Sequence, residues 1–297
     1  MSAETLAIAV PAASAAALER GRAAFLTACR LDVQVRKPGN VSIHSPGHGM
    51  LAQQFLDSAA AAQQALFAPG LSVGQRIEGA VRATLAVAGC NTNLGIVLLC
   101  APIAAALERA PGVRDAAGLH AAVRAVLREL DVEDARHAFR AIAAAHPGGL
   151  GRAETQDVND APTVGLREAM ALAAQRDSIA RQYACGFDDL FAVGLPAFQA
   201  GTDAEDGMLR AWLACLARWP DSHIVRKQGA AVAQTVLEQA MAFEQWLKVE
   251  SPAALAGALA TWDESLKNQG LNPGTSADLA VASALLGTLV SRGTERD

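Results

Sequence analysis

Long runs rich in alanine and leucine, each ended by a stretch of glycine, proline or asparagine, constrain the fold of this chain most. Apolar residues recur at helical spacing, as from Ser72 to Leu85, and nowhere alternate over a useful length as in a strand. The run from Gly95 to Ala106 is apolar all round, which predicts a central buried helix. Because neither an internal repeat nor a linker interrupts residues 1–297, we expect one all-α domain, a bundle of roughly eleven helices.

Charge and cysteine patterns exclude several classes of protein. The formal net charge is -5 and the basic residues are scattered, so we expect no nucleic-acid surface. No apolar run of about 18 residues lacks a breaker, so we expect no membrane span. The N-terminal apolar run carries Glu4 and Pro11, unlike a signal peptide, and the five cysteines lack CxxC spacing. These features predict a soluble cytoplasmic protein with free thiols.

One ten-residue stretch, PDSHIVRKQG from Pro220 to Gly229, gathers charge in a chain that is only 19% charged. Asp221 follows a proline and is placed to lie at a helix N-terminus. Arg226 and Lys227 point about 100° apart on a helix, so both can reach one broad anion such as a polyphosphate. The alternative is a capped surface helix with solvated basic residues.

Two earlier stretches have a similar character. Lys37-Pro38-Gly39-Asn40 offers an ammonium beside a backbone that can approach a ligand closely, and is otherwise an ordinary surface loop. Asn91-Thr92-Asn93 comes directly before the apolar run and offers two amides, a hydroxyl and free N–H groups, which suits an anion or a ribose. Helix capping by Asn93 is the simpler interpretation, but it accounts for only one of the three residues.

A long loop from His146 to Thr163 is rich in glycine and acidic residues. Loops of this length inside a compact domain are usually functional or disordered. Gly148 and Gly149 are candidates to cradle a phosphate, although a lone glycine run is a weak signal. Asp157 offers a hard oxygen ligand of the kind that holds Mg²⁺ against nucleotide phosphates, and a solvated acidic loop is the alternative.

Two further aspartates have open interpretations. Asp177 either forms a helix ion pair with Arg181 or faces a pocket as a base or metal ligand. Asp278, which follows Asn272-Pro273-Gly274, either favours the dipole of a helix start or lines a pocket. No HExxH or paired Cys/His spacing occurs, so we expect no zinc. Because each of these stretches lies at the end of a predicted helix, we expect the helix ends to converge on one pocket.

Taken in order, these motifs resemble the triphosphoribosyl-dephospho-coenzyme-A synthase family. They span residues 35 to about 285 and comprise KPGN at Lys37, NTNLGI at Asn91, GGLG at Gly148 with DV at Asp157, AAQRDSIARQY at Ala173, the acid-to-RKxG pattern at Asp221 and NPGTSADL at Asn272. The archaeal-type branch is the most similar. The branch that serves citrate lyase has NTHKG in place of NTNLG, and DTN in place of Asp221-Ser222-His223.

The resemblance implies an all-helical transferase that joins C1' of the ATP ribose to the 2'-hydroxyl of 3'-dephospho-CoA, releases adenine and keeps the triphosphate. It implies that phosphates are held by Lys37, Arg226 and Lys227. Asp157, Asp177 and Asp221 would bind Mg²⁺ or supply the base. The residues expected to be catalytic are Asp177, Asp221 and Arg226. Ribose contacts and the pocket wall would involve Gly39, Asn40, Asn91, Thr92, Asn93, Gly148, Gly149, His223 and Asp278.

Two other functions stay open from the sequence alone. The same C1' chemistry could use another acceptor, in the biosynthesis of a pterin- or furan-type one-carbon carrier. The second alternative is a nucleotide- or CoA-binding protein without catalysis. It is disfavoured because a binding protein needs the cations Arg226 and Lys227 more than it needs the acid Asp221, and this chain has all three. A homodimer is compatible with an alanine-rich helical chain.

Overall fold

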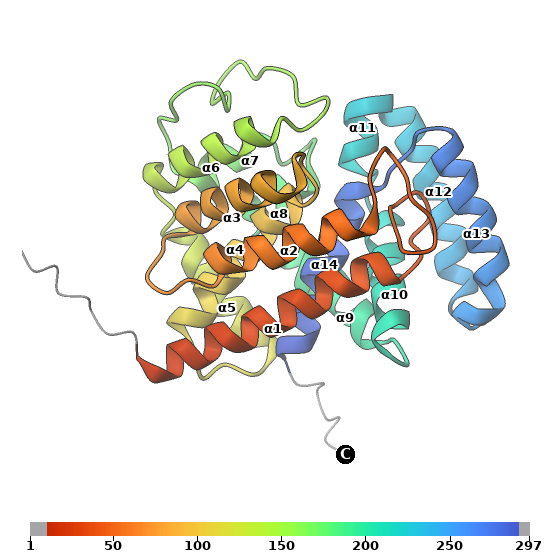
Figure 1. Ribbon diagram of the computed structural model, residues 1–297, viewed down its shortest axis with the longest axis horizontal. Helices are drawn as coiled ribbons and strands as arrows, with labels where there is room; N and C mark the ends of the chain where they lie inside the picture. The colour runs from red at the N-terminus through yellow and green to blue at the C-terminus, as the bar shows by residue number, and fades with distance from the viewer. Residues whose placement is uncertain (1–10, 291–297) are drawn as a thin grey trace, which may run out of the picture.

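The computed structural model describes residues 11–290, which form a helical protein (Figure 1). Residues 1–10, which hold most of the N-terminal apolar run weighed as a signal peptide, lie outside the described residues. In chain order the helices are α1 Ala12–Gln34, α2 Ala52–Leu66, α3 Val73–Ala88, α4 Leu94–Arg109, α5 Ala116–Arg128, α6 Val132–Ala145, α7 Leu166–Ala171, α8 Ser178–Cys185, the π-helix η1 Leu190–Gly194, α9 Leu195–Gln199, α10 Ala204–Leu216, α11 Ser222–Gln228, α12 Ala230–Trp246, α13 Pro252–Asn268 and α14 Gly274–Leu289.

The all-α fold class is confirmed. Between residues 11 and 290 no strand forms, and the only bridges are two isolated pairs, Ser42 with Ser45 and Gly47 with Met50. This part of the chain has fourteen α-helices rather than roughly eleven, because several predicted helices are divided.

The divisions have local causes. Helices α7 and α8 are separated by a turn over residues 172–176, after which Asp177 leaves helical geometry and caps α8 with its side chain. Gly229, at φ 91°, separates α11 from α12, a conformation that glycine adopts without a steric penalty. Pro196 lies in the first turn of α9, where its missing N–H is not needed.

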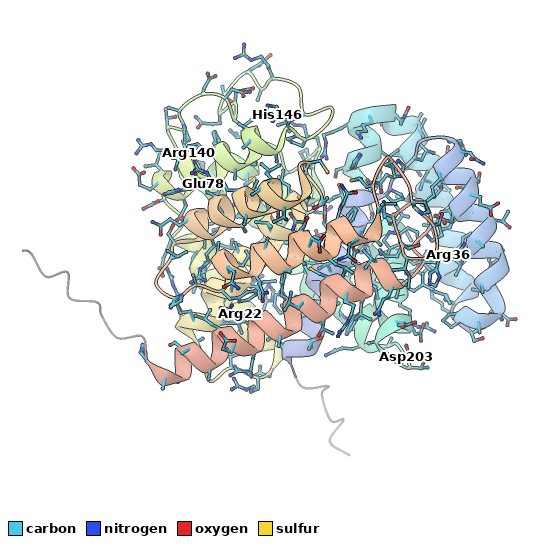
Figure 2. All side chains as sticks on the ribbon, viewed as in Figure 1. Arg22, Arg36, Glu78, Arg140, His146 and Asp203 are labelled. Atoms are coloured by element: carbon cyan, nitrogen blue, oxygen red, sulfur yellow. The ribbon has the colours of Figure 1, made fainter. Side chains whose placement is uncertain are left out.

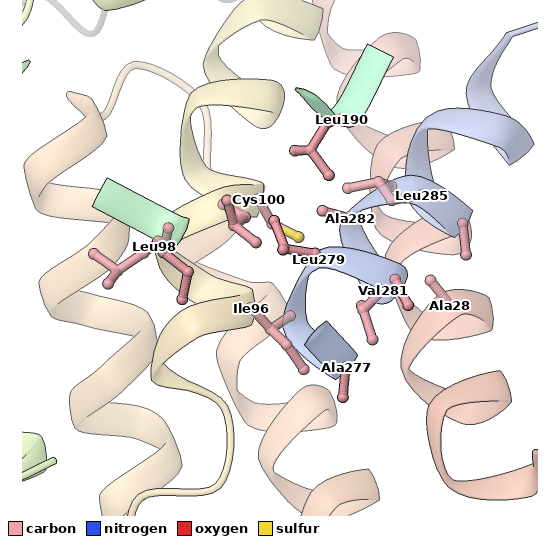
Figure 3. Packing of buried hydrophobic residues seen from close by; sticks show 14 of the residues in the cluster. Ala28, Ile96, Leu98, Cys100, Leu190, Ala277, Leu279, Val281, Ala282 and Leu285 are labelled. Carbon is pink, nitrogen blue, oxygen red and sulfur yellow. The ribbon is translucent and has the colours of Figure 1, made fainter. Parts of the chain in front are cut away.

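The central helix predicted from the apolar run is α4, in which every residue from Leu94 to Leu107 is buried. Figure 3 shows Ile96 and Cys100 of α4 beside Leu279 and other side chains of α14, which is buried over most of its length. The buried apolar residues form one cluster that extends from Ala17 to Val290. Burial of this surface is the main force that holds the bundle together.

The remaining helices surround this centre. Helix α3 packs between α2 and α6, and α14 packs against both α1 and α10. Helices α12 and α13 form the side of the molecule farthest from α5 and α6 in the view of Figure 1. No described helix is both long enough and apolar enough to cross a membrane.

A charged cluster joins α3 to α6 on the surface. Arg140 Nε and Nη2 donate to the two carboxylate oxygens of Glu78 at 3.0 and 2.7 Å, and His137 Nδ1 also contacts this carboxylate (Figure 2). These hydrogen bonds lower the pKa of Glu78 to about 2, the bidentate bond from Arg140 contributing most. The cluster therefore stabilises the contact between the two helices.

Candidate active site

The ends of several helices meet at a cavity of about 410 Å³. The C-terminal turn of α1, the first turns of α4 and α14, and the segments that start α8 and α11 supply polar side chains to it. The loop from His146 to Gly165 covers one side, and apolar side chains of α6 and α7 form another wall. The expectation that the irregular stretches converge on one pocket is met, because each of them supplies at least one lining residue.

Eleven of the residues predicted for the site line this cavity: Asn40, Asn91, Thr92, Asn93, Gly148, Gly149, Asp157, Asp177, His223, Arg226 and Asp278. Four others do not, namely Lys37, Gly39, Asp221 and Lys227. The two groups differ in what their polar atoms contact.

Lys37 is buried beneath the cavity rather than facing it. Its Nζ forms an ion pair with Asp32 Oδ1 at 3.1 Å and also donates to the backbone carbonyl of Asp32. Gly39 has φ 84°, and its N–H donates to Asp263 Oδ1 at 2.8 Å. The KPGN stretch thus fixes the end of α1 against α13, and the structure gives Lys37 no access to a phosphate in the cavity.

Asp221 joins the starts of two helices. Its Oδ1 accepts hydrogen bonds from the N–H groups of His223 and Ile224, at 2.9 and 3.2 Å, which caps α11. Its Oδ2 accepts from the N–H and the hydroxyl of Ser276 in α14, both at 2.8 Å. The carboxylate is 2% exposed, and this burial raises its pKa despite the four hydrogen bonds. The predicted helix-start position is confirmed, but Asp221 does not face the cavity.

Asp177 and Arg226 form the charged pair at the cavity wall. Asp177 Oδ1 caps α8 by accepting from the N–H groups of Ile179 and Ala180, while its Oδ2 accepts from Arg226 Nη1 at 2.6 Å. The considered pairing of Asp177 with Arg181 does not form, since Arg181 pairs with Asp189 at 2.9 Å. Arg226 Nε is buried and has no partner among the described residues, so this guanidinium keeps a donor for a ligand.

Amide side chains from two of the predicted stretches lie at the cavity with unused hydrogen-bonding capacity. Asn93 is 4% exposed; its Oδ1 accepts from Thr84 Oγ1 at 3.0 Å, and its Nδ2 has no partner. Asn40 Nδ2 donates to Asn272 Oδ1 at 2.6 Å, which leaves Asn40 Oδ1 buried without a donor. Asn91 instead caps the start of α4, because its Oδ1 accepts from the N–H of Leu94.

His223 is held neutral at the cavity wall. Burial, and then the nearby charges of Lys227 and Arg226, lower the pKa of His223 to about 4. Its Nε2 is buried and has no partner among the described residues. A neutral imidazole at this place donates or accepts one hydrogen bond without adding charge.

The loop that covers the cavity rests on α11. A Cβ atom added to Gly148 would lie 2.8 Å from Lys227 Cε, and one added to Gly149 would lie 2.8 Å from the carbonyl oxygen of Arg226. Gly149 also has φ 75°, so both its conformation and this close approach require glycine. Lys227 is therefore at the rim, beside the glycine run, although it does not line the cavity itself.

The three aspartates predicted as ligands of Mg²⁺ do not form one site. Asp157 accepts from the N–H groups of Ala153 and Asn159 and from the Asn159 amide, Asp177 from Arg226, and Asp221 from four donors. Among residues 11–290, no group of three or more His, Cys, Asp or Glu side chains is arranged to hold a metal ion. The donor set thus does not fit a resident magnesium centre built from these acids.

Two features of the cavity were not predicted. Asp32 lines it, from the last turn of α1, and the only signal in the sequence is one acid on an otherwise apolar helix face. The apolar wall includes Phe139, Ile142 and Met170, which have the same helical spacing as core residues. Sequence reasoning cannot separate a core face from a cavity wall, because both require apolar side chains at the same spacing.

Fold and cavity together define an all-α protein whose helix ends converge on one polar cavity. The chain belongs to the ATP:dephospho-CoA triphosphoribosyl transferase (CitG) family, whose family model matches residues 19–296. Its fold is similar to a crystal structure from Archaeoglobus fulgidus, provisionally described as a triphosphoribosyl-dephospho-coA synthase. The TM-score is 0.61 and the identity 22%, over 79% of this chain and 98% of that one. Among curated proteins, no relative was found.

Membership of this family confirms the resemblance carried by the motifs. The chain is a transferase of the pentosyl class, with triphosphoribosyl-dephospho-CoA synthase activity. A different acceptor and a non-catalytic binding protein, the two alternatives left open by the sequence, are not favoured.

Proposed function

We propose that the cavity at the helix ends is where the 5'-triphosphoribosyl group of ATP is transferred to the 2'-hydroxyl of 3'-dephospho-CoA with release of adenine. The observation that carries this proposal is Arg226, whose Nη1 is fixed by Asp177 while its Nε remains free and buried at the cavity. A guanidinium oriented in this way is suited to phosphate oxygens, because it offers planar donors that need no reordering on binding.

The phosphates are assigned to the rim that Arg226 shares with its neighbours. Arg176 lines the cavity, is exposed, and forms no ion pair with any described residue. Lys227 is also exposed and lies beside Gly148. Three cations and the glycine run thus surround one opening, which suits a triphosphate.

The ribose and the base are assigned to the interior. Asn93 Nδ2 and Asn40 Oδ1, both buried without partners, are placed to contact hydroxyl groups. The wall that includes Phe139 and Met170 suits the face of adenine. Holding two large substrates in register is the main contribution that such a cavity makes to the rate.

Magnesium is assigned to the substrate rather than to the protein. ATP carries Mg²⁺ on its phosphates, and proteins often add only one carboxylate or none to such a complex. This assignment agrees with the separation of Asp157, Asp177 and Asp221 into three different hydrogen-bonding roles. The chemistry that Mg²⁺ supplies there is neutralisation of the triphosphate charge.

The compartment and the oligomeric state belong to the proposal as well. All five cysteines are free, which supports a reducing compartment such as the cytoplasm. A homodimer remains our expectation from composition, and sedimentation of the purified protein would test it.

Substitution of Arg226 tests the proposal. With ATP, Mg²⁺ and dephospho-CoA, we expect Arg226→Ala to raise the KM for ATP about 10- to 100-fold, because charged hydrogen bonds to phosphate are lost. Arg218→Ala is the matched control, since Arg218 is exposed and lies away from the cavity. Adenine release measured by chromatography gives the rates. Equal KM values for the two variants would count against the placement of the triphosphate at this rim.

A further inference from the structure

Five carboxylates stand at or beside the cavity, and they differ in their partners. Asp157, Asp177 and Asp221 each accept several hydrogen bonds, and Asp32 is paired with Lys37. Asp278 alone forms neither a hydrogen bond nor an ion pair with any residue between 11 and 290. A carboxyl group left without partners in a helical interior is unusual, and a role toward a ligand explains it.

The position of Asp278 is built by three helices. It is the fifth residue of α14 and faces α4, where a Cβ atom on Gly95 would overlap its carboxylate. Glycine at this position of α4 therefore leaves room for the carboxyl group. Asp32 reaches the same cavity from the end of α1.

A second observation marks this end of the cavity as a ligand site. Asn93 immediately precedes α4, two residues before Gly95, and is more than nine-tenths buried. Its Nδ2 lines the cavity with no acceptor among the described residues. An amide donor oriented by Thr84 and left unpaired requires an acceptor from a bound molecule.

The charges around Asp278 support a protonated state. Burial raises the pKa of Asp278 well above its ordinary value, and the charges of Asp32 on α1, Asp221 before α11 and Asp177 before α8 raise it further. Arg226 opposes this shift, and the Cys100 thiol is the titratable neighbour on α4. One of the two carboxyl groups in this site is paired with a cation and the other is not. Such a difference in surroundings lets one group act as an acid and the other as a base.

We propose that Asp278 is the general acid that protonates adenine as it leaves, and that Asp32 is the base that receives the proton of the acceptor hydroxyl. This assignment rests on the proposed function and names the residues that perform its chemical step. It differs from the sequence-based expectation, in which Asp177 and Asp221 were catalytic.

The step balances with these two groups alone. The C1'–N9 bond breaks with its electron pair moving to adenine, and adenine takes the proton of Asp278. The 2'-oxygen of dephospho-CoA forms the new bond to C1', and its proton passes to the Asp32 carboxylate. Return of that proton from Asp32 to Asp278 restores the starting state. A positioned acid of this kind contributes about 10²- to 10⁴-fold to a rate.

The test compares two leaving groups. One substrate is ATP, and the other carries 4-nitrophenolate in place of adenine at C1', which departs without needing a proton. We expect Asp278→Asn to lower kcat/KM at least about 100-fold with ATP, and by less than about fivefold with the nitrophenolate substrate. Asp32→Asn should lower both rates, since it acts on the acceptor. Asp57→Asn, at an exposed position away from the cavity, is the control.

The outcomes distinguish failure of this inference from failure of the proposed function. Asp278→Asn should be at least as resistant to heat as the unaltered protein, because an unpaired, half-buried carboxyl group is removed. If it did not fold, Asp278→Ala would be compared on the same two substrates. Equal losses on both substrates, or turnover of ATP within about threefold of the unaltered protein, would overturn the inference alone. Absence of adenine release by the unaltered protein would overturn the proposed function and this inference with it.

Discussion

At the scale of single residues, the partners of a side chain decide its role more than its type does. Asp221 and Asp278 are both acids beside a helix start, yet one accepts four hydrogen bonds and the other accepts none from the described residues. Lys37 and Arg226 are both cations, yet one is fully committed to Asp32 and the other keeps a free donor. The proposed acid, Asp278, and the proposed phosphate ligand, Arg226, are therefore both groups with unused hydrogen-bonding capacity.

Glu78 gives a prediction at this scale that concerns stability. Its pKa is lowered to about 2, first by its hydrogen bonds to Arg140, so it stabilises the fold above the ordinary carboxyl pKa and loses this effect as the pH falls toward 2. We expect Glu78→Gln to lower the free energy of unfolding by about 1–2 kcal/mol at pH 7, after discounting for solvent screening.

Urea unfolding at several pH values measures this effect. The difference between the unaltered protein and Glu78→Gln should shrink steadily below pH 4.5. The exposed Glu250 provides the control substitution, Glu250→Gln. A difference that stayed constant from pH 7 to pH 3 would show that the carboxylate charge of Glu78 is not what stabilises the contact between α3 and α6.

At the scale of helices, the side chains of the site lie at the starts and ends of the helices, and the distance between neighbouring helices depends on small residues. Gly95 in the first turn of α4 is the clearest case, because it faces the carboxylate of Asp278 on α14. The distance between these two helices therefore sets the position of Asp278. The loop over the cavity depends in the same way on Gly149, which lies against α11.

We expect Gly95→Ala to lower the free energy of unfolding by about 1–3 kcal/mol and the rate of adenine release by more than about tenfold. The added methyl group must displace Asp278 or separate α4 from α14, and overpacking of a filled interior has this cost. Gly112→Ala is a suitable control, since a Cβ there meets no atom within 4 Å. Thermal unfolding and turnover are measured on both variants, and unchanged turnover in Gly95→Ala would contradict the fixed placement of Asp278.

At the scale of the whole molecule, the sequence predicts the fold class and the region of the site but not the roles within it. Helical periodicity and the apolar run of α4 are local signals, so the all-α class and the central helix follow from them. Each of the irregular stretches reaches the same cavity with at least one residue. The division of helices at Asp177 and Gly229 was missed, because single caps and glycines compete with long periodic runs.

The roles could not be predicted because they depend on contacts between distant parts of the chain. Asp221 accepts two hydrogen bonds from Ser276, 55 positions away, and the PDSHIVRKQG stretch contains no sign of this contact. Asp32 looks like an isolated acid on an apolar face until α1 is placed beside α14. The same limit applies to the apolar cavity wall, whose residues have the spacing of a core.

Mass spectrometry of the reaction product tests the central claim most directly. The purified protein is incubated with ATP, Mg²⁺ and 3'-dephospho-CoA, with each substrate omitted in turn, and both free adenine and the nucleotide products are identified. We predict adenine together with dephospho-CoA that carries one triphosphoribosyl group, and neither product when dephospho-CoA is omitted. Bound ATP that is never cleaved, or adenine released with no change in the mass of dephospho-CoA, would contradict the account.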